Sequence, residues 1–156
     1  MALKQKSGFT LIELLVVISI IGLLASVVLV SLNGARAKAR DARRLSDMKQ
    51  IMTALELYYD KNGYLPITSS YGENNSGGWD YSSQGDFLTF LRTSGFLSTA
   101  PKDPVNNGVG DVYYGGTGFA YAYYCYSGEN SISLGSKMEN GSVNWIASHK
   151  AGYQCQ

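Results

Sequence analysis

The sequence predicts an α+β fold, in which a long N-terminal α-helix packs on a small antiparallel β-sheet. One observation that favours it is an apolar segment near the N-terminus, which continues without proline into a second helical segment. Another is a change in composition, because 15 of the 18 glycines and ten of the 12 tyrosines lie from Gly63 onward. Frequent glycine and tyrosine are typical of short strands joined by turns. The chain is therefore predicted to change from helix to sheet near residue 63.

The charge changes at the same place. Residues 1–61 carry nine Lys or Arg against five Asp or Glu, whereas residues 62–156 carry four against seven. The net charge of the whole chain is only +1, so no nucleic-acid partner is expected. We divide the chain into a leader (1–8), a transmembrane helix (9–32), an extramembrane amphipathic helix (33–62) and a C-terminal globular β-rich domain (63–156).

The transmembrane helix is predicted from length and apolarity. Leu11 to Leu32 is 22 residues, which as a helix spans about 33 Å, enough for a bilayer core of about 30 Å. Its single charged residue is Glu13. The run is longer than the apolar core of an ordinary secretory signal. A secreted chain cut near Ala35 is therefore the weaker alternative.

The next segment has the pattern of an amphipathic helix. Apolar residues recur at spacings of three and four: Leu45, Met48, Ile51, Met52, Leu55, Tyr58 and Tyr59. Asn62 and Gly63 form a stop signal, and Pro66 follows shortly after. Asn33-Gly34 is the one weak point in this helix, and the sequence leaves its continuity there open.

A basic stretch follows the apolar run. It contains Arg36, Lys38, Arg40, Arg43 and Arg44 against Asp41. Three interpretations stay open: contact with anionic lipid headgroups, ion pairing with acidic residues of neighbouring subunits such as Asp47, Glu56 or Asp60, and a solvated helix face. Five basic residues after the span and two before it favour a cytoplasmic C-terminus by the positive-inside rule.

The C-terminal domain shows short apolar runs between turn residues. Asp86–Gly95 is predicted as a short helix, and 112–114, 119–126, 131–134 and 143–147 as strands. Cys125 and Cys155 are the only cysteines, and an even pair beyond a membrane span indicates a disulfide. His149 is the only histidine, and no nucleophile motif or phosphate-binding loop is present. The sequence is not that of an enzyme.

The N-terminal residues carry a family resemblance. A short basic leader ends in Gly8, and Phe9 and then Glu13 open the apolar run. This arrangement resembles the prepilin peptidase signature of type IV pilins and type II secretion pseudopilins. The resemblance implies cleavage between Gly8 and Phe9, methylation of the new amine of Phe9, and a role for Glu13 in setting subunit registry. Snorkelling of Glu13 into the headgroups is the alternative.

Later features resemble the major pseudopilin of type II secretion. They are Tyr64-Leu65-Pro66, Pro101-Lys102-Asp103-Pro104 and Ser133-Leu134-Gly135. In that family an aspartate-rich calcium loop follows Ser-Leu-Gly, whereas residues 136–141 here carry a single carboxylate, Glu139. Calcium takes about six to eight oxygens, so Glu139 is a weak calcium candidate and no cofactor is expected otherwise. Type IV pilins also often carry a C-terminal disulfide.

The resemblance implies a structural subunit of a type IV filament with a pilin-like fold, most simply a pseudopilin of a type II secretion system. The alternatives are a major or minor type IV pilin for adhesion, motility or DNA uptake, and, in another class, a signal-anchored ligand-binding ectodomain. The implied partners are copies of itself and related pilins, the prepilin peptidase, an inner-membrane assembly platform with its ATPase, and membrane lipid. The implied location is the inner (cytoplasmic) membrane, crossed once with the C-terminal domain outside the cytoplasm, and an extracytoplasmic filament after assembly.

Overall fold

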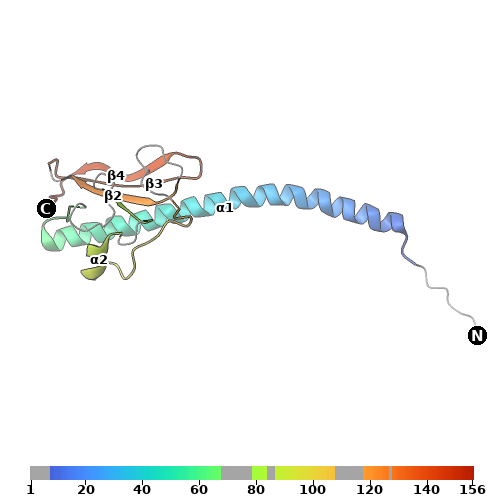
Figure 1. The fold of residues 1–156 in the computed structure, drawn as a ribbon, viewed down its shortest axis with the longest axis horizontal. Helices are drawn as coiled ribbons and strands as arrows, with labels where there is room; N and C mark the ends of the chain where they lie inside the picture. The colour runs from blue at the N-terminus through green and yellow to red at the C-terminus, as the bar shows by residue number, and fades with distance from the viewer. Residues whose placement is uncertain (1–7, 68–78, 84–86, 108–117, 127) are drawn as a thin grey trace, which may run out of the picture. The chain divides into compact units, whose positions relative to one another are not determined.

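The structure is a computed structural model that describes residues 8–67, 79–83, 87–107, 118–126 and 128–156. The elements follow in the order α1 (Leu11–Asn62), β1 (Asp80–Tyr81), α2 (Thr89–Thr93), β2 (Tyr121–Tyr126), β3 (Ser131–Lys137) and β4 (Val143–Ala151) (Figure 1). The predicted α+β, pilin-like fold is confirmed. The chain divides into two compact units, residues 1–38 and 39–156, which are described separately.

In the first unit, α1 carries the predicted membrane segment. Every large apolar side chain from Phe9 to Leu32 is exposed, with exposed fractions from 43% at Leu32 to 80% at Leu11. Within the part of the chain that the structure describes, α1 is the one helix long and apolar enough to cross a membrane. The helix continues through Asn33 and Gly34, a point that the sequence left open.

In the second unit, α1 presents the predicted apolar stripe to the sheet. Met48, Ile51, Met52, Leu55 and Tyr58 are buried, and Leu45 and Tyr59 pack against them. The helix ends at Asn62, whose side-chain amide donates to the Tyr58 carbonyl, and Gly63 follows with φ of 76°. A glycine in this left-handed conformation ends a helix at little cost. The amphipathic pattern therefore predicted the packed face correctly.

The sheet has four antiparallel strands in the order β1-β2-β3-β4. β3 and β4 contain the predicted strands 131–134 and 143–147 and are longer than expected, whereas β2 begins two residues after the start of the predicted strand 119–126. α2 is the short helix expected in 86–95. β1 was not predicted, and the expected strand 112–114 lies outside the described residues. One face of the sheet contributes Tyr121, Tyr123 and Cys125 to the core with α1.

The opposite face of the sheet carries a second aromatic cluster. Tyr81 and Ala122 are buried there, and Trp79, Val143 and Trp145 pack on them. Trp79 is centred 5.1 Å from the ring of Tyr124 and 5.9 Å from that of Trp145. The tyrosines of β2 thus alternate between the two faces, as expected for a strand.

Candidate functional site

The start of α1 is the first candidate site, because it carries the residues of the prepilin-type motif. Gly8, Phe9 and Thr10 precede the helix and are exposed. The backbone N–H and the hydroxyl of Thr10 donate to Oε2 of Glu13 at 2.9 and 2.7 Å, and the Glu13 N–H donates to Oγ1 of Thr10 at 3.3 Å. This reciprocal pair is a capping box, which satisfies two backbone donors that a helix start otherwise leaves unpaired.

The capping box gives Glu13 a partner within its own chain. The sequence reasoning missed Thr10, although Thr10 and Glu13 have the Thr-x-x-Glu spacing from which a capping box can be predicted. Phe9, Ile12, Val16 and Val17 line a shallow apolar hollow beside this carboxylate. The site therefore places one charged group in an otherwise apolar surface, with a local hydroxyl as its hydrogen-bond partner.

The second candidate site is a charge cluster in the unit of residues 39–156, centred on Arg44. This guanidinium is fully buried. Its Nε and Nη2 donate to Asp103 at 2.7 and 3.1 Å, and its Nη1 donates to Asp41 and to Glu139, both at 2.8 Å. The ring of Phe119 lies 4.5 Å from the guanidinium carbon. One side chain of α1 thereby holds the loop around residue 103 and the turn between β3 and β4.

Arg40 completes the cluster one helical turn earlier. Its Nε and Nη2 donate to the two carboxylate oxygens of Glu139 at 2.7 and 2.8 Å, a bidentate pair. Hydrogen bonds from Arg40, helped by Arg44 and opposed by burial, lower the pKa of Glu139 to about 2. Glu139 is thus an anion at neutral pH, and its oxygens are already hydrogen-bonded.

This geometry bears on the calcium expectation for residues 136–141. Both oxygens of Glu139, the one carboxylate of that segment, accept hydrogen bonds from arginine. Among the described residues, no group of three or more His, Cys, Asp or Glu is placed to hold a metal ion. Since calcium takes about six to eight oxygens, the sequence expectation that calcium binds here only weakly, if at all, stays a prediction.

The cluster also changes the interpretation of the basic stretch. Arg40 and Arg44 turn toward carboxylates of their own chain, a possibility that the sequence reasoning did not consider. Arg43 lies 3.6 Å from Asp47 with its side chain 65% exposed, and Arg36 and Lys38 are exposed. The one sequence signal for this pairing was Asp103, which lies between Pro101 and Pro104. Its partner Arg44 is 59 residues away in the sequence, so the pairing could not be read from the sequence alone.

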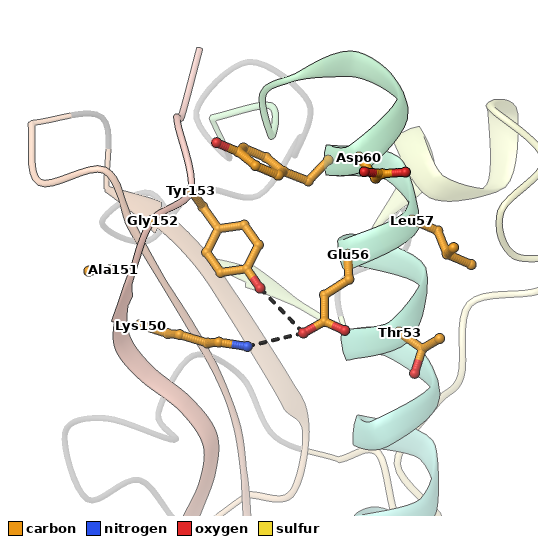
Figure 2. Close-up of a pocket in the computed structure, with 9 residues that line it drawn as sticks. Thr53, Glu56, Leu57, Asp60, Lys150, Ala151, Gly152 and Tyr153 are labelled. Carbon is orange, nitrogen blue, oxygen red and sulfur yellow. Dashed lines mark hydrogen bonds and ion pairs between the residues drawn. The ribbon is translucent and has the colours of Figure 1, made fainter.

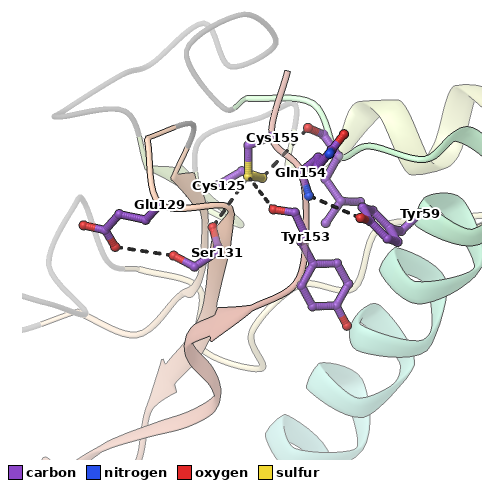
Figure 3. Close-up of a disulfide and its surroundings, with 8 residues drawn as sticks. Tyr59, Cys125, Glu129, Ser131, Tyr153, Gln154 and Cys155 are labelled. Carbon is purple, nitrogen blue, oxygen red and sulfur yellow. Dashed lines mark hydrogen bonds between the residues drawn. A yellow bond between two sulfur atoms is a disulfide. The ribbon is translucent and has the colours of Figure 1, made fainter.

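The C-terminus is fixed by the disulfide between Cys125 and Cys155, whose Cα atoms are 5.8 Å apart (Figure 3). The last residues also pair with the segment after α1: the Leu65 N–H donates to the Gln154 carbonyl at 2.7 Å, and the Gln156 N–H to the Leu65 carbonyl at 3.0 Å. In the chain-entropy model such a bridge contributes about 3–4 kcal/mol. The disulfide expected from the sequence is present.

A surface groove lies between α1 and the end of β4 (Figure 2). In it Lys150 and the Tyr153 hydroxyl point to Glu56, at 3.0 and 3.4 Å from its Oε1. Both members of the Lys150–Glu56 pair are about half exposed, so the pair contributes less than about 1 kcal/mol. Leu57, also in the lining, is 54% exposed.

Comparisons with known proteins identify the family of the chain. Residues 3–29 match the family model described as the prokaryotic N-terminal methylation motif. The chain is 31% identical over 149 residues to type II secretion system core protein G of Escherichia coli K12, covering 96% of this chain and 97% of that protein. It is 42% identical to core protein G of Aeromonas hydrophila over 65 residues, 42% of this chain and 46% of that protein. No solved structure matched the chain.

A fimbrial protein of Neisseria meningitidis is a more distant relative, 29% identical over 145 residues, 90% of this chain and 72% of that protein. A methylation motif at the start of a long apolar helix, followed by a small antiparallel sheet, defines the pilin-like class of filament subunits. The chain belongs to the type IV pilin and pseudopilin family, on the branch of the type II secretion core protein G, the major pseudopilin. It is a structural filament subunit, and its apolar helix and motif fit anchoring in the inner membrane.

Proposed function

We propose that this chain is the main repeating subunit of a type II secretion pseudopilus, with no catalytic activity of its own. The observation that carries the proposal is the near full-length similarity to core protein G of Escherichia coli. The exposed apolar surface of residues 9–32 supports it, because this surface requires lipid before assembly and other helices afterwards. The assembly platform and its ATPase would transfer the subunit from the lipid of the membrane into the filament.

Deletion of the gene tests which machine the filament serves. In a secretion system, the deletion is expected to abolish release of the secreted proteins while leaving surface motility and attachment intact. The wild-type gene on a plasmid should restore release. A deletion that abolishes motility, attachment or DNA uptake but spares secretion would instead assign the chain to a type IV pilus, as the fimbrial relative allows.

Processing is the second part of the proposal. A prepilin peptidase would cut between Gly8 and Phe9, and the new amine of Phe9 would be methylated. Both residues are exposed before the first turn of α1, so a protease can reach the bond. Gly8→Ala is expected to leave the leader attached, as measured by the intact mass of the membrane-extracted protein. Gly22→Ala is the matched control, since the added methyl group meets open space there too. A Gly8→Ala protein with the wild-type mature mass would refute this cleavage site.

The proposed role of Glu13 is subunit registry through the positive N-terminus of a neighbouring subunit. A carboxylate within an apolar surface is expensive in a membrane, and a buried ion pair specifies register better than it adds stability. The capping box offers an alternative explanation, because Thr10 already holds this carboxylate. Registry requires the charge, whereas capping requires the hydrogen bond with Thr10.

Two substitutions separate these roles. Thr10→Ala removes the hydroxyl and keeps the charge, whereas Glu13→Gln keeps an acceptor for the Thr10 donors and removes the charge. If Glu13 sets registry, Glu13→Gln should prevent filaments in electron micrographs while Thr10→Ala still forms them. Filaments of normal length from Glu13→Gln would exclude the registry role.

A further inference from the structure

Three carboxylates from three segments of the chain converge on one buried guanidinium. Asp41 belongs to α1, Asp103 to the loop before β2, and Glu139 to the turn after β3, and each accepts a hydrogen bond from Arg44 at 2.7–2.8 Å. The Asp103 side chain is also held by the backbone of the loop that follows it, because its Oδ1 accepts the N–H groups of Val105 and Asn106 at 2.8 and 3.3 Å. The Glu139 N–H donates to Asp41 at 3.1 Å.

Ionised carboxylates repel one another, so such a set stays fully ionised only with a positive charge at its centre. Two solutions are available in proteins: a bound divalent cation, which takes several carboxylate oxygens, or a buried basic side chain. Here the centre is filled by Arg44, whose side chain and whose Asp103 partner are both 0% exposed. Arg40 supplies a second positive charge to Glu139.

We infer that Arg44 is a built-in cation that does the work of a structural metal, so that the unit of residues 39–156 folds without calcium. The planar fork of arginine suits this role, because its donors point in several fixed directions and reach three carboxylates at once. The turn after β3 and the loop around Asp103 are thereby fastened to α1. The inference holds whichever machine the filament serves.

The test uses the full chain purified in detergent. Thermal unfolding is followed by circular dichroism, with either a calcium chelator or millimolar calcium chloride present. The wild-type melting temperature is expected to be the same in both conditions. Arg44→Ala in the chelator should melt on the order of 10 °C lower, because it removes the counter-charge of Asp41 and Asp103 and leaves Glu139 with Arg40 alone. Calcium should recover part of that loss, since the vacated centre is lined by oxygens.

Arg43→Ala is the matched control, because Arg43 is the adjacent residue of α1 but is mostly exposed. It should melt near the wild-type temperature in both conditions. If Arg44→Ala yields no folded protein, Arg44→Lys replaces it and should melt several degrees below wild type, since an ammonium group cannot reproduce the fork. A rise in the wild-type melting temperature with calcium would overturn the inference. So would an arginine variant, Ala or Lys, that melts with the wild type.

Discussion

Tyr121 and Tyr123 are two residues apart on β2, both fully buried on the face that packs against α1. Their hydroxyls differ in hydrogen bonding. The Tyr121 hydroxyl donates to Oδ2 of Asp47 at 2.7 Å, whereas the buried Tyr123 hydroxyl has no hydrogen-bond partner among the described residues. Burial raises the pKa of both phenols above the usual range, so both are neutral at physiological pH. The cost of an unpaired buried hydroxyl therefore applies to Tyr123 alone.

Removing the two hydroxyls is predicted to have different effects. Tyr121→Phe should lower the free energy of unfolding by about 1–2 kcal/mol, because Asp47 loses a donor. Tyr123→Phe should be neutral or stabilising by up to about 1 kcal/mol, since no hydrogen bond is lost. Urea unfolding of the two variants in the same detergent measures both changes, and each variant controls for the other. Equal losses would mean that the Tyr123 hydroxyl is paired.

The charge at Glu139 predicts a dependence of stability on pH. Hydrogen bonds from Arg40 lower the pKa of this carboxylate to about 2, below its ordinary value near 4.3. The stabilisation from its ionised form is therefore complete above about pH 4.5 and is lost as the pH falls toward 2. Arg40, Arg44 and Asp41 face Glu139.

Glu139→Gln is predicted to be less stable than wild type by about 1–2 kcal/mol at pH 7, a modest figure because the pair is partly solvated. The difference should be largely lost near pH 2, where about half of the Glu139 carboxyls are neutral in the folded state. Thermal unfolding at several pH values measures it, with Glu56→Gln as the control because that carboxylate pairs only at the surface. A difference that persists unchanged at pH 2 would contradict the assigned pKa.

At the scale of elements, the contact between β3 and β4 depends on a glycine. A methyl group at Gly135 would lie within 2.4–2.9 Å of three atoms of the Trp145 indole, well inside van der Waals contact. Gly135 and Trp145 are also cross-strand partners at a shift in the register. The glycine therefore allows the indole to lie flat on the neighbouring strand.

Gly135→Ala is predicted to displace Trp145 and to destabilise the sheet by about 1–3 kcal/mol. Chemical denaturation measures the loss, and a red shift of tryptophan fluorescence should accompany it. Gly128→Ala is the control, because its added methyl group meets nothing within 4 Å. A Gly135→Ala protein with wild-type stability would mean that the indole moves aside without cost.

An element could be predicted from sequence when the residues that determine it lie close together along the chain. The stripe from Met48 to Tyr58 predicted the packed face of α1, because helical periodicity lies within one segment. β1 was missed because a strand of two residues is too short to show the alternating pattern that identifies a strand. The Arg44 cluster was missed because its partners lie 59 and 95 residues away, and only the packed fold shows which helix face meets which loop.

At the scale of the whole molecule, two features give opposite indications of membrane orientation. The basic residues of the 36–44 stretch favour a cytoplasmic C-terminus by the positive-inside rule. The disulfide between Cys125 and Cys155 favours an oxidising compartment, where such bridges persist. The positive-inside rule is a statistical tendency, whereas the disulfide is part of this folded unit itself. We therefore take the disulfide as the stronger indication of orientation.

The final prediction is that residues 39–156 lie outside the cytoplasm. Protease added to intact spheroplasts should degrade this unit, as detected by an antibody against its C-terminus, while a cytoplasmic marker protein survives. An alkylating reagent that crosses membranes should not modify Cys125 and Cys155 before reduction, because both sulfur atoms are in the bridge. The Cys125→Ala variant is the matched control, since it leaves Cys155 free to react. A unit that resists protease and carries two reactive thiols would place it in the cytoplasm, and the basic stretch would then have determined the orientation.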